Sequence, residues 1–238
     1  MEEFANQCKN GDFSNLKDIY EKLKKTNFSF ISECFNNVNR EMLKQNQFDY
    51  DLNGTTCTLV FQFMKYLVCA NFGDSRGIII FDDGTKANQS IFPLTHFHKP
   101  NLPQESDRIL FHGGRIDKLV DQYGNKIGPD RIFKGNLAYP GLTITRSLGN
   151  FQAKDCGVIS EPEINEYSIN RKSKYMVICS KGVWEWLSNE DVRDHGNYFL
   201  QNEGIAPFCY SLVKKVIQTC EERHGMRDDI TVVCVNFD

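Results

Sequence analysis

Three short runs with strand composition follow one another in the first third of the chain, at Thr58–Phe63, Tyr66–Asn71 and Gly77–Phe81. Each run is rich in β-branched, aromatic or aliphatic residues, which suit a pleated and half-buried surface. Only a few residues separate the runs, which predicts consecutive strands that begin with a hairpin. Any fold for this chain must therefore accommodate a β-meander.

Helices are predicted on both sides of this meander. Residues 29–45 carry apolar side chains at helical spacing, and residues 13–25 show the same pattern earlier in the chain. A third apolar stripe predicts a buried helix over residues 205–222. Four further strands are predicted at residues 142–145, 163–168, 175–180 and 230–235. This mixture of helices and strands predicts the α+β class.

Length and composition predict one ordinary globular domain over residues 1–238. The chain is 40% hydrophobic and 25% charged, and its net charge of −3 lacks the basic excess expected of a nucleic-acid-binding protein. No apolar run approaches the roughly 20 residues that span a bilayer. Met1–Asn6 lacks the charged and then apolar pattern of a signal peptide, which predicts a cytoplasmic protein.

The nine cysteines include no Cys-x-x-Cys pair, and several lie in apolar runs. This spacing argues against a zinc site or a disulfide framework. We expect small, reduced core residues, as in a cytosolic protein.

Eight motifs follow one another in a fixed order from about residue 54 to the C-terminal end. They are Gly54–Thr56, Ala70–Arg76, His98–Pro100, Arg108–Ile116, Tyr139–Asn150, Ile159–Glu163, Tyr175–Glu190 and Asp228–Val233. In this order they resemble the metal-dependent (type 2C, PPM-type) serine/threonine protein phosphatases. Each motif alone is a weak signal, whereas the ordered series is specific.

The resemblance implies an α+β fold in which a central β-sandwich is flanked by helical layers (α-β-β-α). The family's N-terminal Asp-Gly-His-Gly-Gly motif is absent, and Met1–Ala5 aligns just after its place. We therefore expect a sandwich without its N-terminal strands, whose open edge another protein chain covers by strand addition or a packed interface. The alternative is that the sequence is a fragment of a longer chain.

The family's chemistry sets a demanding requirement for carboxylates. Its members hold two divalent ions, usually Mg²⁺ or Mn²⁺, whose bridging water attacks phosphoserine or phosphothreonine. Adjacent divalent ions need several anionic oxygens to offset their mutual repulsion. The family pattern supplies aspartates from Asp-Gly-His-Gly-Gly, from Asp-Gly-x-Trp and from a terminal Asp pair, and a third ion uses the aspartate of Asp-His-Lys-Pro.

Most of these ligands are replaced here. Lys181 stands at the aspartate of Asp-Gly-x-Trp and Phe97 at that of Asp-His-Lys-Pro, whereas Asp228 is retained with Asp229 beside it. The strands that carry the family's phosphate-binding arginine are missing as well. We therefore expect a vestigial site with no catalytic residue, metal or other cofactor; if the protein is active, Asp228 would bind Mg²⁺ or Mn²⁺.

The charge of Lys181 gives a specific expectation. Two unit charges about 4 Å apart interact by roughly 4 kcal/mol at an effective dielectric constant near 20, and a divalent ion would be repelled about twice as strongly. The favourable arrangement is an ion pair, which we predict between Lys181 and Asp228 or Asp229. The alternative is a surface lysine that aligns at this position by chance.

Four retained motif residues are predicted to be structural. Asp74 and Arg76 should satisfy partners within a turn, and Arg146 occupies a structural position of the family pattern. Glu185 is expected to help cap and pack the helix that follows, since residues 188–191 form a capping signal. His96 and His98 alternate around Phe97, which predicts that both imidazoles share one face.

Three functions remain open. The first is an inactive phosphatase-like domain that acts as a structural or scaffolding subunit, and the second is an active Mg²⁺- or Mn²⁺-dependent serine/threonine phosphatase. The third is an inactive domain that binds phosphoproteins. The Asn-, Lys- and Phe-rich composition with Tyr139–Leu142 suggests a protist source, and hence a cytoskeletal or ciliary setting. The insertion Asp117–Lys134 is either a binding loop or a solvated one.

Overall fold

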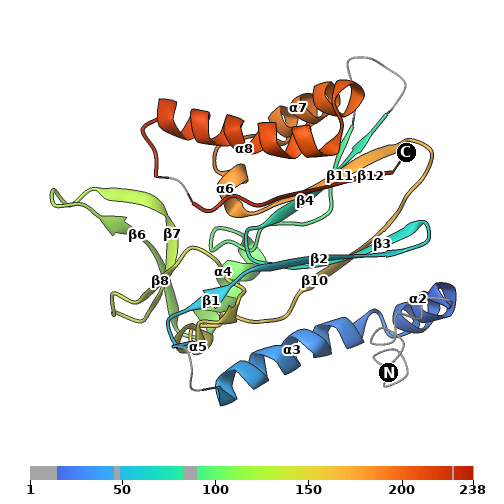
Figure 1. The fold of residues 1–238 in the computed structure, drawn as a ribbon. Coiled ribbons are helices and arrows are strands. Elements are labelled where there is room, and N and C mark those ends of the chain that lie inside the picture. Colours follow the sequence, from blue (N-terminus) through green and yellow to red (C-terminus); the bar gives the residue numbers. More distant parts are fainter. Residues whose placement is uncertain (1–14, 46–48, 83–89, 227, 238) are drawn as a thin grey trace. The chain divides into compact units, whose positions relative to one another are not determined.

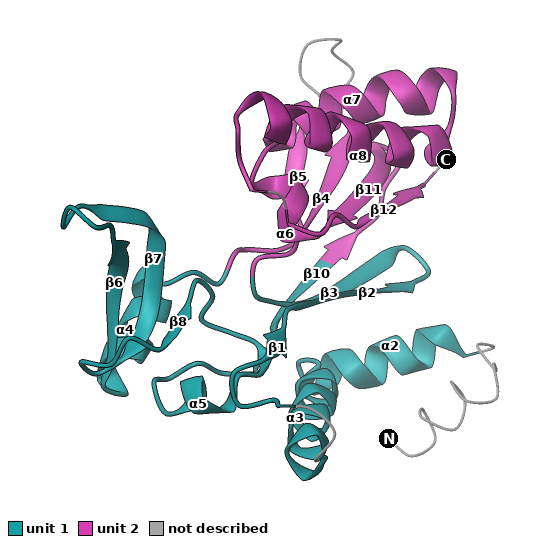
Figure 2. Ribbon diagram, turned by 60° about the vertical axis from the view of Figure 1, so that its left-hand side comes forward, with its two compact units in different colours: residues 1–73, 98–166 teal, residues 74–97, 167–238 magenta. Residues whose placement is uncertain are grey.

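A computed structural model of the chain describes residues 15–45, 49–82, 90–226 and 228–237 (Figure 1). The chain forms two compact units, which consist of residues 1–73 with 98–166 and of residues 74–97 with 167–238 (Figure 2). Helices and antiparallel sheets are mixed, as predicted for the α+β class. The expectation of a single domain over residues 1–238 remains a prediction, and the signal-peptide argument falls on residues 1–6, outside the described residues.

The first unit contains β2, β3 and most of β10, which form a three-stranded sheet in the order β10-β3-β2. Its strands are β2 (Cys57–Phe63), β3 (Tyr66–Phe72) and β10 (Glu163–Ser168). Strands β2 and β3 form the predicted hairpin, with Cys57 opposite Phe72 and Phe63 opposite Tyr66. Among the described residues, β2 pairs only with β3 and so lies at an edge of this sheet.

Two helices cover one face of this sheet, α2 (Leu16–Lys25) and α3 (Ser29–Lys44) (Figure 1). Their apolar stripes pack against alternate side chains of the strands, as the 3.6-residue and 2-residue periods require. The Tyr20 ring stacks on Tyr66 with centroids 4.4 Å apart, and Phe35 meets Phe72 edge to face at 5.1 Å. Helix α3 ends one residue before its predicted bound, and α2 ends at the predicted Lys25 but begins at Leu16, three residues after its predicted start, of which residues 13 and 14 lie outside the described residues.

The remainder of the first unit was largely unpredicted. It contains α4 (Pro103–Phe111), α5 (Phe151–Lys154), a small ladder of β1 (Gly54–Thr55) with β9 (Leu148–Gly149), and a second three-stranded sheet. That sheet consists of β6 (Gly114–Val120), β7 (Lys126–Lys134) and β8 (Pro140–Leu142). The insertion Asp117–Lys134 is therefore a β-hairpin rather than an irregular loop.

The strand predicted over residues 142–145 is wrong, because β8 ends at Leu142. Thr145 lies in irregular backbone, where its amide donates to the carbonyl of His98 and its hydroxyl donates to the carboxylate of Glu105. The amide and the hydroxyl of Thr145 thus bond to residues distant in the sequence rather than within a strand ladder.

The second unit contains a four-stranded antiparallel sheet in the order β12-β11-β4-β5. Its strands are β4 (Arg76–Phe81), β5 (Ile91–Pro93), β11 (Ser173–Cys179) and β12 (Val232–Asn236). Helices α7 (Asn189–Asn202) and α8 (Ile205–Glu222) cover one face of it (Figure 2), and α6 (Lys181–Trp184) follows β11. Helix α8 has the predicted bounds, because its apolar stripe is buried at Phe208, Leu212 and Val216.

A helix is expected after the capping signal at residues 188–191, and α7 follows that signal. Few apolar residues recur along α7, so its length was not predicted. Its N-terminus is nevertheless fixed by the capping box that the sequence indicated: the Ser188 hydroxyl accepts from the Asp191 amide, and the Asp191 carboxylate accepts from the Ser188 amide. Such a cap stabilises a helix by about 1 kcal/mol.

Cysteines of the described residues are free thiols, and Cys69, Cys156, Cys179 and Cys220 are buried as predicted. Cys34 is exposed, contrary to the expectation of core residues, although it follows the buried Ile31 by three residues on α3. The histidine prediction is also wrong: His98 is buried whereas His96 is exposed. In the described part of the chain, no helix combines the length and apolar character needed to cross a membrane.

Candidate functional site

The site predicted from the sequence lies where β11 ends and α6 begins. The Ser180 hydroxyl accepts a hydrogen bond from the Thr231 amide at 2.9 Å and donates to the Asp229 carbonyl at 3.0 Å. Gly182 lies directly beneath the same segment, where a Cβ atom would be 2.5 Å from the Asp229 carbonyl oxygen. These contacts hold the segment before β12 against the start of α6.

Lys181 and Asp228 are brought together by this arrangement. The Lys181 Nζ atom lies 2.8 Å from Asp228 Oδ2 and 2.9 Å from Glu185 Oε1. Burial disfavours the ammonium, but the hydrogen bonds to Asp228 and Glu185 outweigh it and raise the pKa of Lys181 above its ordinary value. The predicted ion pair with Asp228 is thus confirmed. Asp229 takes part through its backbone carbonyl, which accepts the hydrogen bond from the Ser180 hydroxyl.

Glu185 has a different role from the one expected. It lies four residues after Lys181, a spacing at which side chains meet on a helical turn. Helix α7 is capped by Ser188 and Asp191 instead. Lys181 therefore lies between two carboxylates, and the sequence argument identified only one of them.

Phe97, at the second replaced ligand position, contacts a retained residue of the motif series. Its ring centroid lies 5.0 Å from the Arg76 guanidinium carbon, and the Trp184 ring lies 5.5 Å from the same atom. Burial lowers the pKa of Arg76 from its ordinary value, and the charge of Glu190 opposes that shift. Arg76 is thus held by two aromatic faces, which attract a guanidinium through the ring quadrupole. Asp74, two residues earlier, is only 4% exposed, as expected of a turn residue with a structural role.

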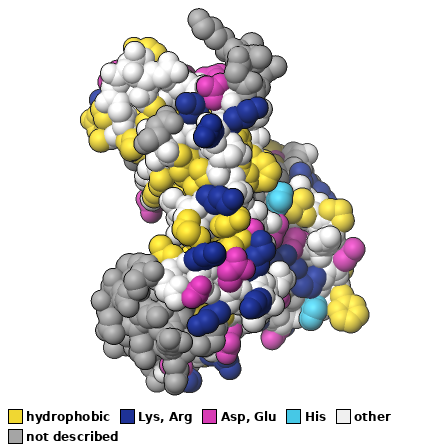
Figure 3. All heavy atoms as spheres, turned by 90° about the vertical axis from the view of Figure 1, so that its right-hand side faces the viewer, with side chains coloured by type: hydrophobic (Ala, Val, Ile, Leu, Met, Phe, Trp, Pro, Cys, Tyr) yellow, Lys and Arg dark blue, Asp and Glu magenta, His cyan; other side chains and the backbone are white. Residues whose placement is uncertain are grey.

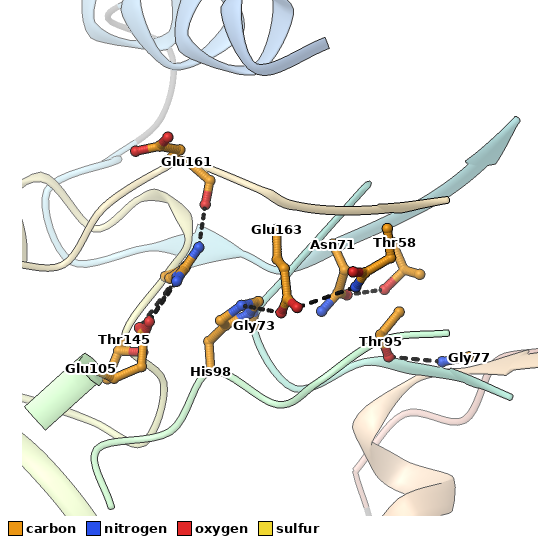
Figure 4. Close-up of polar contacts among 12 residues, drawn as sticks. Thr58, Asn71, Gly73, Gly77, Thr95, His98, Glu105, Thr145, Glu161 and Glu163 are labelled. Atoms are coloured by element: carbon orange, nitrogen blue, oxygen red, sulfur yellow. Dashed lines mark hydrogen bonds and ion pairs between the residues drawn. The ribbon is translucent and has the colours of Figure 1, made fainter. Parts of the chain in front are cut away.

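Arg146 belongs to a charge cluster around the buried carboxylate of Glu105 in the first unit; Figure 4 labels Glu105 with Thr145 and Glu161. Its Nη2 atom lies 2.6 Å from Glu105 Oε1, its Nη1 atom donates to the Glu161 carbonyl at 3.1 Å, and Arg108 Nη2 lies 2.6 Å from Glu105 Oε2. Burial raises the pKa of Glu105, but hydrogen bonds from Arg108, Arg146 and Thr145 more than reverse this and hold it well below its usual range. This geometry agrees with the structural role predicted for Arg146.

Sequence reasoning missed Glu105 and a second buried contact beside it. His98 Nε2 lies 3.3 Å from Glu163 Oε2, and His98 Nδ1 accepts from the Gly73 amide at 3.2 Å (Figure 4). A local signal existed only for Glu105, which precedes Arg108 by three residues on α4. The partners of Glu163 and Arg146 are distant in sequence and carry no such signal.

Charged side chains do not gather by sign on the face drawn in Figure 3, where basic and acidic side chains are interspersed. Within the described ranges, no group of three or more His, Cys, Asp or Glu side chains is arranged to hold a metal ion. The groups around Asp228 also do not fit a divalent ion, because the Asp228 carboxylate is ion-paired with the ammonium of Lys181.

Three comparisons place the fold and the motif series among known proteins. The family model described as Protein phosphatase 2C matches residues 3–220. The structure is similar to the crystal structure of serine-threonine phosphatase 2C from Toxoplasma gondii, with a TM-score of 0.79 and 20% identity over 93% of this chain and 71% of that chain. A C. elegans sex determining protein has a similar fold with a TM-score of 0.59 and 20% identity, covering 75% of this chain and 38% of that one.

Curated relatives from plants agree with the family model. Probable protein phosphatase 2C 48 of rice (Oryza sativa subsp. japonica) is 30% identical over 218 residues, which cover 88% of this chain and 58% of the relative. Probable protein phosphatase 2C 72 of Arabidopsis thaliana is 32% identical over 211 residues, covering 85% and 59% respectively. The chain thus spans less than two thirds of the length of these relatives.

Fold, motif order and relatives define a domain of the metal-dependent protein phosphatase class. The chain belongs to the protein phosphatase 2C family.

Proposed function

We propose that this chain is a catalytically inactive protein phosphatase 2C-like domain that serves as a structural or scaffolding subunit of a larger protein assembly. The observation that supports the proposal is the ion pair between Lys181 and Asp228, at 2.8 Å. Lys181 stands where the family pattern has a metal-binding aspartate, and Asp228 is the main ligand that the sequence retains.

The donor set argues against the family's metal chemistry. A divalent ion at Asp228 would have to displace an ammonium that also binds Glu185 at 2.9 Å. Phe97, at the position of the third-ion aspartate, offers an aromatic ring that faces Arg76. Neither an ammonium nor an aromatic ring ligates a hard cation such as Mg²⁺ or Mn²⁺. No step of phosphoester hydrolysis is therefore assigned to these residues.

A scaffolding subunit requires partner chains, and we propose that they cover the β2 edge of the first unit. The setting that we propose is the cytoplasm, and within it a cytoskeletal or ciliary assembly. The alternative function is an active Mg²⁺- or Mn²⁺-dependent phosphatase that hydrolyses phosphoserine or phosphothreonine. It is favoured by family membership alone.

Metal binding and turnover decide between these two functions. Mn²⁺ binding is measured by calorimetry, and hydrolysis of an aryl phosphate is measured on the same samples. The wild type is compared with Lys181→Asp and with Lys44→Asp, a matched control because Lys44 also forms an ion pair, with Glu41 on α3.

The proposal expects neither Mn²⁺ binding nor turnover in the wild type and in Lys44→Asp. Metal uptake by Lys181→Asp alone would identify the lysine as the block. Mn²⁺ binding together with turnover by the wild type would refute the proposal and establish the active alternative.

A further inference from the structure

An apolar groove of about 250 Å³ lies between α3 and β2 in the first unit. On the helix side it is lined at Ile31, Phe35 and Val38, which follow one another at helical spacing. On the sheet side it is lined by Leu59 and Phe61, which share one face of β2 because they are two residues apart. The other lining residues are also apolar: Leu23, Phe30, Cys34 and Phe63.

The groove opens to the surface. Val38 is 48% exposed and Leu59 is 41% exposed. Both are apolar, so the part of the chain that the structure describes leaves a hydrophobic mouth in contact with water. Covering this apolar surface is favourable in proportion to the area that is removed from water.

Strand β2 forms one border of this groove and is an edge strand among the described residues, since its ladder partner is β3. Edge strands are commonly protected from pairing with other chains by charged side chains. Cys57–Phe63 contains no Asp, Glu, Lys or Arg, whereas β10 at the opposite edge of the same sheet carries Glu163 and Glu166. The two edges thus differ in protection, and the unprotected one adjoins the groove.

An apolar groove beside an edge strand without charged residues favours an extended chain as the occupant. A strand that pairs with β2 satisfies the backbone groups of the edge, and every second side chain then points to the helix face of the sheet. On that face these side chains contact the groove lining, which consists of apolar residues. The alternate residues of the added strand must therefore be apolar and uncharged. A helix would fill the groove but leave the β2 backbone groups unpaired.

We propose that β2 is a strand-addition site for another protein chain, whose extended segment carries β-branched or aromatic residues at alternate positions that fill the groove between β2 and α3. The segment extends the β10-β3-β2 sheet by one antiparallel or parallel strand. This inference rests on the proposed scaffolding function, because it identifies the surface through which partner chains are held.

The test uses the full chain and a heptapeptide that carries fluorescein on its N-terminal amine, fluorescein-Thr-Val-Thr-Val-Thr-Val-Thr-amide. Binding is followed by fluorescence anisotropy, and hydrogen exchange of the β2 amides is measured with and without the peptide. One control peptide has the same side chains with N-methyl groups along one edge, and a second has Asp in place of Val. Leu59→Lys is compared with Leu43→Lys, which changes an α3 leucine that is 57% exposed and does not line the groove.

The proposal expects saturable binding of the first peptide and slower exchange of the β2 amides. Binding should weaken about tenfold or more with the N-methylated peptide, the Asp peptide and Leu59→Lys, and stay unchanged in Leu43→Lys, because both backbone pairing and groove filling contribute. The N-methylated peptide needs no protein variant, so the comparison holds even if Leu59→Lys fails to fold.

Three results would overturn the proposal. The first is no binding of the unmethylated peptide to the wild type. The second is equal binding of the N-methylated peptide, which would reduce the groove to a nonspecific apolar patch. The third is a wild-type homodimer that Leu59→Lys abolishes, which would make a second copy the occupant. Phosphatase activity combined with peptide binding would refute the scaffolding function while leaving strand addition intact.

Discussion

The ammonium of Lys181 lies 2.8 Å from the carboxylate of Asp228, 47 residues later in the chain. The same ammonium lies 2.9 Å from Glu185, so one cation is shared by two carboxylates. In a family whose members hold metal ions with aspartates, a protein cation thus lies beside a retained aspartate.

Removing the charge of Asp228 should cost little stability. Asp228→Asn leaves Lys181 paired with Glu185. The side chains of Lys181 and Asp228 are each exposed by a third or more. Exposed ion pairs contribute up to about 1 kcal/mol, so we expect the free energy of unfolding in urea to fall by less than that. A loss of several kcal/mol would mean that the pair is a main support of the fold.

Removing the charge of Glu105 should have a much larger effect. The Glu105 carboxylate is buried against Arg108 and Arg146, and its neutralisation leaves these two guanidinium groups without their counter-charge. We expect Glu105→Gln to lower the free energy of unfolding by about 3 kcal/mol. The matched control is Glu41→Gln, whose ion pair with Lys44 is exposed and should change stability by less than about 0.5 kcal/mol.

The Glu105 carboxylate also predicts how the free energy of unfolding changes at acid pH. The pKa of Glu105 is lowered in the folded state, so its contribution is present above the ordinary glutamate value of about 4.3 and is lost as pH falls through the lower folded pKa. Urea unfolding of the wild type below about pH 4.3 should therefore show a loss of stability that Glu105→Gln lacks. Parallel curves for the two proteins would contradict the assignment.

The contact between Phe97 and Arg76 should be measurable as a coupling energy. The guanidinium carbon lies 5.0 Å from the ring centroid. A double-mutant cycle with Phe97→Leu and Arg76→Met should give a coupling of about 1 kcal/mol, since cation–π pairs contribute this much when partly desolvated. Additive effects of the two substitutions would show that the ring merely packs near the charge.

The buried amine of Lys154 predicts that the free energy of unfolding rises with pH in the alkaline range. A lysine stabilised by an ion pair would make it fall instead. The Nζ atom of Lys154 donates to the Ser147 carbonyl at 2.5 Å and to the Ser160 hydroxyl at 3.0 Å, and burial lowers its pKa to about 8. Between this value and the ordinary lysine value of about 10.4, the unfolded chain binds more protons, so stability rises with pH.

The measurement for Lys154 is the free energy of unfolding at about pH 7.5 and about pH 9.5. The wild type should gain stability over this interval relative to Lys154→Met. Lys118→Met, which changes an exposed lysine of β6, serves as the control and should follow the wild type. If Lys154→Met and Lys118→Met behave alike, the Lys154 amine is not perturbed.

Strong periodicity made part of the fold predictable. The bounds of α8 and the β2–β3 hairpin follow from apolar residues repeated at 3.6-residue and 2-residue intervals. By contrast, α7 and the β6–β7 hairpin are polar or interrupted by turns, so their patterns carry little signal. Their formation is supported instead by a capping box in α7 and by pairing between strands in the hairpin.

The sequence by itself determined the family and the unlike charges of Lys181 and Asp228, because the order of motifs and the identity of side chains are read directly along the chain. Only the tertiary structure decided that Glu185 shares the same cation, that Phe97 and Trp184 hold Arg76, and that Glu105 gathers Arg108 and Arg146. These contacts depend on how the backbone brings distant segments within a few ångströms, and burial then strengthens the interactions between their charges.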